Sequence, residues 1–437
     1  MQMIPGILQL NSKTKYGMSS RNVPSYLFRP LNTTLGMCIV GCSRKDVSSN
    51  VLALINVEHW ETEALTRGTL IKILGNCGDK TAEEEAILYQ YITPNRKKLV
   101  ITEPSFDSHR LVTGYTFNVD PIGCVDIDDA ITIGDDGYIY IVIADVACWM
   151  KKNPELFARA SASGQTFYNN GSIVLPLLPI QEECSLLPGR KRRGIALKYS
   201  ETEVSFERVM IINNQSFTYE NIHLSKYGSL LQELASKFAK RDIVDSHECI
   251  EQIMIFYNSE VAKELIRKRK GLLRSQNAPD INKLNEYAKI GIDMKFLANK
   301  SAFYCDASQP TKHWGLDIEY CHATSPIRRF ADIVNQLVLM NEDATVDIAQ
   351  LNILSTNAKK YERDIFFLNT ILKPNRTVNG IVLTERRIWV PEWKRVITCE
   401  NLFNTGTRGK LYYSVDMDKP TWKKRLVFRF EDTNYLE

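Results

Sequence analysis

The sequence has no long apolar run, no paired cysteine spacing and no strong excess of one charge. None of its segments approaches the roughly 20 apolar residues that a membrane-spanning helix requires, so we expect no membrane span. The first residues lack the basic start, apolar stretch and small-residue cleavage site of a secretory signal. We therefore expect an intracellular protein, and the sequence does not separate cytoplasm from nucleus.

Cysteine occurs at ten positions, but its spacing matches neither a disulfide framework nor a zinc site. Cys38 and Cys42 come closest to a metal-binding pair, and their spacing is wrong for a zinc knuckle. The six histidines form no cluster that changes this interpretation. We predict free thiols, with neither disulfides nor zinc.

The net charge of +4 is only mildly basic and does not by itself identify a polyanionic partner. Basic side chains are nevertheless dense in two runs, residues 188–194 and 265–274, and acidic side chains are concentrated in residues 120–129. A nucleic-acid contact explains either basic run. A solvated helix face or loop explains each run equally well.

Changes of pattern along the chain predict three domains. Short apolar or alternating runs separated by Gly, Asn, Ser and Pro occupy residues 1–100 and indicate a small β-barrel. Residues 101–372 begin with strand-like runs and continue with longer helical patterns. Strand patterns return in residues 373–437. We predict a multidomain α+β protein in which small OB-type β-barrels flank a mixed α/β core.

The last predicted barrel is basic. From Ile371 onward the chain has thirteen Lys or Arg against eight Asp or Glu, a net charge of +5. Barrels of the OB type commonly bind single strands through a basic groove and stacking aromatic side chains. A barrel that only braces the core is the alternative.

Four carboxylates, those of Asp120, Asp126, Asp128 and Asp129, lie within ten positions beside an apolar strand. Like charges at this spacing repel one another, whereas a divalent cation makes their proximity favourable. Oxygen ligands favour Mg²⁺ or Mn²⁺ over zinc, and two such ions can activate a water and hold both oxygens of a displacement at phosphorus. A solvated acidic turn is the alternative, but the run leads directly into an apolar strand. An EF-hand fails because its Gly and final Glu are misplaced.

A second segment, TSPIRRFADIVNQLVLM, predicts the start of a helix. Thr324 or Ser325 can cap this helix, Pro326 suits its first turn, and an apolar stripe follows. Arg328 and Arg329 then fall in the first turn, where the helix dipole already makes the potential positive. A bound phosphate satisfies both arginines, and a neighbouring carboxylate is the structural alternative.

These two segments resemble the signatures of the RNase II/RNase R, or RNB-domain, exoribonuclease family. In that family four aspartates recur at the offsets seen here, and a Gly and a Tyr precede a TSPIRR segment. The ADV, Leu-Pro, Cys-Ser-Leu and late Glu-Arg fragments also follow the family's order. The chain looks nearest to the eukaryotic exosome-associated branch in a compact form. Residues 1–100 are similar to one cold-shock barrel, and residues 373–437 to a shortened S1 barrel.

The resemblance implies a hydrolytic 3′-to-5′ exoribonuclease that converts single-stranded RNA to nucleoside 5′-monophosphates with Mg²⁺, or with Mn²⁺. Asp128, Asp126 and Arg328 would carry the chemistry. The implied metal ligands are Asp120, Asp126, Asp128 and Asp129, and the implied RNA contacts are Tyr168, Arg328, Arg329 and Glu362. Gln276 departs from the pattern because it stands where the family usually has a histidine, which affects RNA threading and partner binding.

Two alternatives come from other functional classes. The first is a catalytically silent RNA-binding relative, against which the presence of all four aspartates and of Arg328 argues. The second is a tethering subunit of an RNA-decay assembly. The enzyme itself would act as a monomer or as a component of such a complex.

Overall fold

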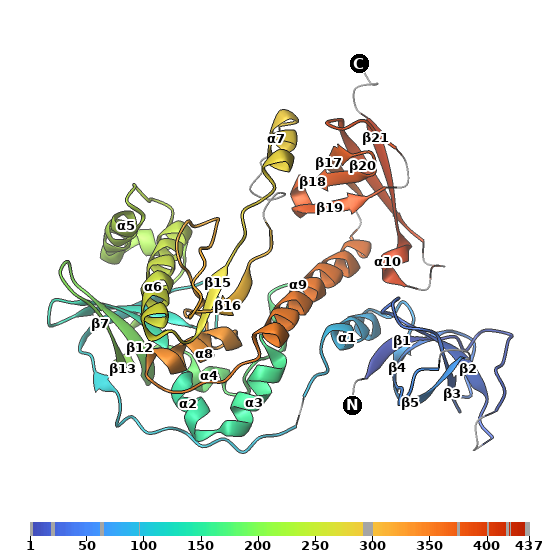
Figure 1. Cartoon of the computed structure of the whole chain (residues 1–437), viewed down its shortest axis with the longest axis horizontal. Helices are drawn as coiled ribbons and strands as arrows, with labels where there is room; N and C mark the ends of the chain where they lie inside the picture. Colours follow the sequence, from blue (N-terminus) through green and yellow to red (C-terminus); the bar gives the residue numbers. More distant parts are fainter. Residues whose placement is uncertain are drawn as a thin grey trace. The chain divides into compact units, whose positions relative to one another are not determined.

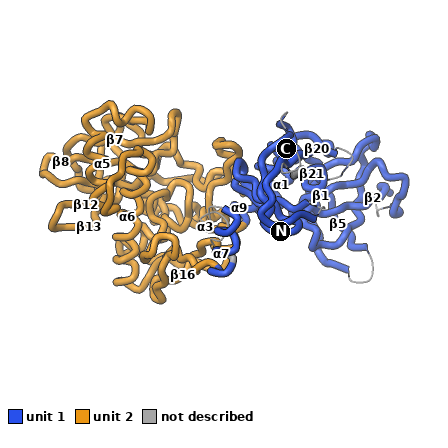
Figure 2. The backbone as a smooth tube through the Cα atoms, turned by 90° about the horizontal axis from the view of Figure 1, so that it is seen from above, with its two compact units in different colours: residues 1–94, 280–298, 357–437 blue, residues 95–279, 299–356 orange. Residues whose placement is uncertain are grey.

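The computed structural model of the 437-residue chain describes residues 3–18, 22–61, 65–95, 97–291, 300–373, 376–399, 402–416, 419 and 421–432. The chain divides into two compact units (Figure 2). Unit 1 comprises residues 1–94, 280–298 and 357–437, and unit 2 comprises residues 95–279 and 299–356. Among the described residues no helix is long and apolar enough to cross a membrane. The three-domain boundaries predicted from the sequence stay a prediction.

Unit 1 begins with a closed five-stranded barrel in the order β1-β2-β3-β5-β4. Its core consists mainly of aliphatic side chains that alternate along short strands, as the sequence predicted. The barrel is followed by helix α1, which Asp79 caps by accepting a hydrogen bond from the Ala82 amide. The bounds of these elements are β1 Ile4–Leu8, β2 Ser25–Pro30, β3 Cys38–Gly41, β4 Val51–Asn56, β5 Thr66–Asn76 and α1 Lys80–Tyr91.

The later part of unit 1 contains a five-stranded sheet in the order β19-β18-β17-β20-β21, together with α7, α10 and most of α9 (Figure 1). Its edge strands, β19 and β21, do not pair with each other in the part of the chain that is described. The bounds are α7 Ile281–Lys289, α9 Ile348–Ile371, β17 Thr377–Thr384, β18 Arg387–Val390, β19 Arg395–Thr398, β20 Arg408–Val415, α10 Trp422–Arg425 and β21 Leu426–Asp432.

Unit 2 is built on a seven-stranded sheet in the order β14-β7-β8-β9-β12-β13-β6, with two two-stranded ribbons beside it, β10-β11 and β15-β16. The strands are β6 Arg110–Leu111, β7 Gly114–Val119, β8 Asp129–Gly134, β9 Ile139–Ala144, β10 Phe167–Asn169, β11 Ser172–Leu175, β12 Lys191–Tyr199, β13 Val204–Ile212, β14 Gln215–Phe217, β15 Leu272–Ser275 and β16 Phe303–Asp306. The helices are α2 Ala147–Lys152, α3 Pro154–Ser163, α4 Gln181–Cys184, α5 Lys226–Ala239, α6 Ser246–Lys268 and α8 Phe330–Leu339.

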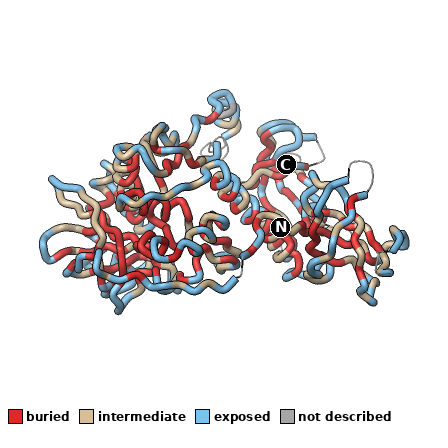
Figure 3. The backbone as a smooth tube through the Cα atoms, turned by 60° about the horizontal axis from the view of Figure 1, so that its bottom comes forward, coloured by how far each residue is buried: buried red, intermediate tan, exposed pale blue. Residues whose placement is uncertain are grey.

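The central strand β9 contributes to a core on each face of this sheet. Ile141 and Ile143 belong to a cluster that includes residues of α5 and α6. Val142 and Ala144 belong to another cluster, which includes residues of α2, α3 and α8. Successive side chains of a strand point to opposite faces, so a continuous apolar strand is buried twice, and Figure 3 shows the buried chain at the centre of this unit. The predicted fold class, a mixed α/β core with OB-type barrel elements, is confirmed.

Both basic runs are used inside unit 2. Arg193 is buried, its guanidinium lies 3.7 Å from the centre of the Phe106 ring, and it donates to the carbonyl of Pro104. In the second run Lys268 donates to the last carbonyls of α8, those of Val338 and Leu339. These two side chains hold neighbouring segments of the protein. Other members of the runs, among them Arg190, Arg267 and Arg269, are exposed, so both interpretations stay open for them.

Candidate functional site

The four aspartates line one cavity of about 670 Å³ in unit 2. Asp120 follows β7, and Asp129 is the first residue of β8, so a single loop between two adjacent antiparallel strands supplies all four. Gly123 has a φ of +79°, and the Cys124 amide donates to the Pro121 carbonyl at 3.1 Å, which closes a tight turn. The turn brings the beginning and the end of the acidic run back together.

Ile127 anchors this loop between Asp126 and Asp128. Its side chain is buried, its amide donates to the Ser185 hydroxyl at 2.9 Å, and its carbonyl accepts from the Leu186 amide at 2.9 Å. Because neighbouring side chains of an extended segment point in opposite directions, burial of Ile127 directs the two aspartates away from the core. Both of their side chains line the cavity.

Each carboxylate has few internal partners. Asp128 accepts from the Ile327 amide at 3.0 Å and lies 3.5 Å from the Arg328 Nε. Asp120 accepts from the Asn118 amide group at 2.8 Å. Asp126 accepts from the Tyr168 hydroxyl at 3.2 Å and from a cysteine thiol. No described Lys or Arg forms an ion pair with more than one of the four carboxylates.

Burial makes ionisation of this cluster costly. It raises the pKa of Asp128 to about 7, with partial opposition from Arg328. Burial, together with the charges of Asp120 and Asp128, raises the pKa of Asp129 well above its usual range. The pKa of Asp120 is raised by burial and, more weakly, by Asp126, against the hydrogen bond from Asn118. An external cation would reverse this effect, and an oxygen-only donor set suits Mg²⁺ or Mn²⁺.

The two arginines have different surroundings. Arg329 forms two hydrogen bonds to the Asp332 carboxylate, at 2.8 and 2.9 Å, so its charge is compensated within the fold. Arg328 is half exposed, lines the cavity and donates to the Ser325 hydroxyl at 3.1 Å. A neighbouring carboxylate therefore accounts for Arg329, and Arg328 also lies 3.5 Å from the Asp128 carboxylate. Both arginines line the cavity, and their contact with a phosphate stays a prediction.

The predicted helix exists, but the predicted cap at Thr324 or Ser325 is wrong because α8 begins at Phe330. The amide of Ser325 donates to Asp332 at 2.7 Å, and the amide of Ile327 donates to Asp128 at 3.0 Å. Two amides that would lie in the first turn of a helix therefore donate to carboxylates. One of these carboxylates, that of Asp128, belongs to a distant segment of the chain. The residues before α8 form a turn, and Thr324, Ser325, Arg328 and Arg329 of this segment line the cavity.

Residues outside the predicted set of site residues complete the cavity wall. Asn258 of α6 donates to the Tyr320 hydroxyl at 3.0 Å and accepts from the Ala323 amide at 2.8 Å, which holds the loop before Arg328. Tyr219 and Glu251 also line the cavity. A polar Asn inside a mainly buried helix face was the available signal, and no local pattern marks the other two.

Gln276, the departure from the family pattern, also braces a loop of the cavity. Its side-chain oxygen accepts from the Gly315 amide at 3.0 Å, and its side-chain nitrogen donates to the Lys300 carbonyl at 2.8 Å. Glu362 lies on α9 in unit 1, where burial raises its pKa against the nearby Lys359 and Arg395. It is not among the residues that line the cavity, and its contact with RNA stays a prediction.

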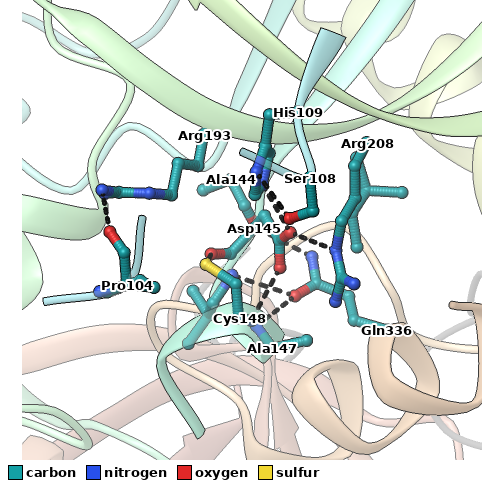
Figure 4. A network of polar contacts seen from close by, with 12 residues as sticks. Pro104, Ser108, His109, Ala144, Asp145, Ala147, Cys148, Arg193, Arg208 and Gln336 are labelled. Atoms are coloured by element: carbon teal, nitrogen blue, oxygen red, sulfur yellow. Dashed lines mark hydrogen bonds and ion pairs between the residues drawn. The ribbon is translucent and has the colours of Figure 1, made fainter. Parts of the chain in front are cut away.

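A second buried acidic group lies outside the cavity (Figure 4). Asp145 accepts from His109 at 3.0 Å, from the Arg208 Nε at 2.8 Å and from the Cys148 amide at 2.9 Å. His109, Asp145 and Cys148 bring three potential ligand atoms within 4.8 Å of one another. However, the guanidinium of Arg208 already neutralises this carboxylate, and hydrogen bonds engage both of its oxygens. We therefore interpret the group as a structural network and not as a metal site.

The sequence of this chain is similar to that of known protein families and of individual proteins. The model described as the RNB domain matches residues 109–227 and 210–341, and the model of the Dis3-like cold-shock domain 2 matches residues 25–92. The probable exosome complex exonuclease RRP44 of Caenorhabditis elegans is 22% identical, over 76% of this chain and 46% of that protein. Ribonuclease R of Mycoplasma pneumoniae is 25% identical, over 41% of this chain and 28% of that protein. The chain spans less than half the length of these relatives.

Solved structures share the fold at low identity. Mycoplasma genitalium RNase R in complex with ribose methylated single-stranded RNA has a TM-score of 0.76 and 17% identity, and the match covers 98% of this chain and 89% of that one. Yeast Ssd1, described as a pseudonuclease, has a TM-score of 0.70 and 18% identity, over 99% of this chain and 71% of that one. The same architecture therefore occurs in an RNase and in a protein described as a pseudonuclease.

Proposed function

The chain belongs to the RNB-domain family, and on this premise we propose that it is a metal-dependent exoribonuclease that hydrolyses single-stranded RNA from the 3′ end to nucleoside 5′-monophosphates. The observation that carries the proposal is the cluster of Asp120, Asp126, Asp128 and Asp129 in one cavity, beside a half-exposed Arg328 and, among the described residues, without a cation for each carboxylate. A nuclease needs such a site, whereas a protein that only binds RNA gains nothing from concentrating negative charge where a phosphate must lie.

The chain's own residues divide the work. The aspartates would hold Mg²⁺ or Mn²⁺, and the bound ions would supply a water of lowered pKa and charge stabilisation at phosphorus. Arg328 presents its donors to the phosphate oxygens on which negative charge develops. The Ile327 amide and Arg328 hold Asp128, while Tyr168 holds Asp126. These contacts keep the two carboxylates oriented in advance, which lowers the cost of reaching the reactive geometry.

The alternative function is a catalytically silent RNA-binding or tethering subunit. The match to the yeast pseudonuclease supports this alternative, because a similar fold also occurs in a protein described as a pseudonuclease. The names of several relatives as exosome exonucleases also make an RNA-decay assembly a reasonable setting. In that case the protein would retain RNA binding without metal-dependent turnover.

The experiment is a Mg²⁺ titration on a 5′-labelled single-stranded RNA, with a matched DNA and a circular RNA as controls. We expect a ladder that shortens from the 3′ end, nucleoside 5′-monophosphates as products, slow reaction on DNA and none on the circle. The 2′-hydroxyl is the group by which a protein distinguishes RNA from DNA. Binding without turnover would establish the silent alternative, and nucleoside diphosphates formed with inorganic phosphate would replace hydrolysis by phosphorolysis.

A further inference from the structure

The two barrel-type sheets of unit 1 have the same strand order, but only the first one is closed. In the first sheet β3 and β5 pair in parallel through three residue pairs and complete the ring. β19 and β21 occupy the corresponding places in the later sheet, and in the part of the chain that is described they do not pair. The later sheet therefore keeps two strand edges, which present unpaired backbone groups.

The free edge of β19 is formed by Val396 and Thr398. The amide of Cys399 donates to the carbonyl of Arg386, its opposite number in the β18–β19 register, at 2.9 Å. Because the backbone groups of a strand point alternately to its two sides, those of Val396 and Thr398 point away from β18. Neither has a backbone partner on that side among the described residues.

The free edge of β21 is formed by Leu426 and Phe428. The amide of Asp416 donates to the carbonyl of Arg425 at 2.8 Å, so by the same alternation the backbone groups of Leu426 and Phe428 point away from β20. These two residues and the two edge residues of β19 line one cavity of about 340 Å³, which we call the barrel gap. Unpaired groups of both edges thus border the same space.

One wall of the barrel gap is apolar. Phe367 of α9 and Trp422 of α10 stack with 6.3 Å between the ring centroids and 21° between the planes, and both line the gap. Ile397, which belongs to the core of this sheet, lines it as well. Because successive side chains of a strand point to opposite faces, an extended segment in the gap would direct every second side chain onto this wall.

Positive charge predominates among the charged residues of the gap. Arg363 and Lys423 are about half exposed, and their side-chain nitrogens lie 3.4 and 2.9 Å from the same carboxylate, that of Asp364. Tyr91 also donates to Asp364, at 2.6 Å. One anion therefore serves two cations, which leaves a positive charge that an acidic side chain of a ligand would complement.

We propose that the barrel gap is the docking site for an extended segment of a partner protein, which inserts between β19 and β21 and closes the barrel. Four antiparallel pairings lead from β19 to β21, so the two edges run in the same direction and one strand can pair with both. β19 has four residues, so the segment needs about four, with apolar side chains toward Phe367 and an Asp or Glu near Arg363. A nucleic acid lacks the alternating N–H and C=O groups that these edges match. The inference is independent of the proposed nuclease activity.

The test begins with a selection of random linear peptides, displayed on phage, against the whole protein. We expect the selected sequences to have apolar residues at alternate positions beside an acidic one. Thr398→Pro removes an outward amide and keeps the bonds to β18, so it should raise the Kd of these peptides at least about tenfold. Thr398→Ala keeps the amide and should stay within about twofold of wild type. Equal affinities for the two variants, or no enriched sequence, would overturn the proposal.

The charge of the gap is tested by reversing it. Arg363→Glu should weaken the same peptides about fivefold, and less at high salt. Arg429→Glu is the matched control, because it makes the same change on β21 at a side chain that is 76% exposed and lies outside the gap. Competition with single-stranded RNA separates the two classes of ligand. RNA that displaces the peptides and binds Thr398→Pro more weakly would show that the edges contact nucleic acid, against the proposal.

Methylation of the peptide amides tests insertion on the wild-type protein and so does not depend on how well a variant folds. An inserted strand donates alternately to β19 and β21, and we expect affinity to fall at consecutive positions of the bound segment. Losses at every second position only would mean that one edge is used, which contradicts closure of the barrel. No loss at any position would exclude strand pairing. Peptide binding requires neither metal nor turnover, so failure of the nuclease proposal leaves this test intact.

Discussion

Unit 2 contains two buried acidic groups that solve the same electrostatic problem differently. Burial alone would raise the pKa of Asp145, but the hydrogen bond from His109 and the charge of Arg208 hold this pKa below its usual range. Burial raises the pKa of Asp128 to about 7, because Arg328 opposes it only in part. The fold itself stabilises the ionised form of Asp145. The ionised form of Asp128 requires a further positive charge, such as a bound cation. A buried acid whose charge is only partly compensated inside the fold is the better indicator of function.

The largest expected effect is loss of turnover in Asp128→Asn. The substitution preserves shape and removes one charge from the four-carboxylate cluster, so the hold on the metal and the activation of its water weaken. We expect the Mg²⁺-dependent rate to fall at least about a thousandfold, with RNA affinity retained. Asp135→Asn, at an exposed turn, is the control and should keep wild-type turnover. A variant that loses affinity and turnover in parallel would show that Asp128 acts in binding.

A substitution in the buried network around Asp145 should change the stability of the protein. Asp145→Asn removes the buried one of two carboxylates that pair with Arg208 and leaves only Glu342, which we expect to lower the free energy of unfolding by about 2 kcal/mol. Denaturant unfolding measures this loss. The Mg²⁺ dependence of the remaining folded enzyme should be unchanged, and a change in it would mean that Asp145 belongs to the metal site.

Arg328 and Arg329 show a similar contrast, because Arg329 is paired with Asp332 within the fold and Arg328 is half exposed. Arg328→Lys keeps the charge but loses the planar set of donors, so we expect kcat to fall about a hundredfold with little change in RNA affinity. Arg329→Lys should mainly reduce stability, because its guanidinium serves Asp332. Steady-state kinetics and thermal unfolding of both variants test this division, and a reversed pattern would contradict it.

The two acids should also give opposite pH dependence in the metal-free protein. The pKa of Asp128 is raised in the folded state, so its contribution to stability is complete below pH about 4 and is lost as the pH rises through about 7. The pKa of Asp145 is lowered, so its contribution is present above pH about 4 and is lost on further acidification. We expect chelated wild type to lose about 2 kcal/mol between pH 5 and 8 and Asp128→Asn to lose less. Identical profiles would argue against this assignment.

The smallest effect concerns Tyr168. Tyr168→Phe removes the hydrogen bond to Asp126 and should cost about 1 kcal/mol in kcat/KM, or roughly fivefold. Tyr168→Ala also removes the ring, which the family resemblance places against the RNA bases. The end product should then change in length while the first cleavages continue, because one lost stack matters most when few contacts remain. An unchanged end product would leave Tyr168 with its role toward Asp126 only.

Local patterns predicted the acidic cluster because its members are close in sequence. Ten positions and one tight turn are enough to bring the four aspartates together between β7 and the start of β8, and the apolar strand that follows fixes their side of the sheet. The strand-like runs at the start of residues 101–372, one of which forms β9, likewise indicated the mixed α/β core. Such features depend on neighbours within a few residues, so the sequence contains them completely.

Partners far apart in the chain decided the rest. The residues before Phe330 do not extend the helix, because the Ile327 amide donates a hydrogen bond to Asp128, which lies 199 positions earlier in the sequence. The basic run at residues 188–194 left an RNA contact and a solvated face equally open, and the structure assigns one of its members, Arg193, to Phe106 and the Pro104 carbonyl. The sequence by itself determined which charges the protein has and where apolar strands must be buried. Only the tertiary structure decided which charges are neutralised inside the fold, because neutralisation requires proximity in space.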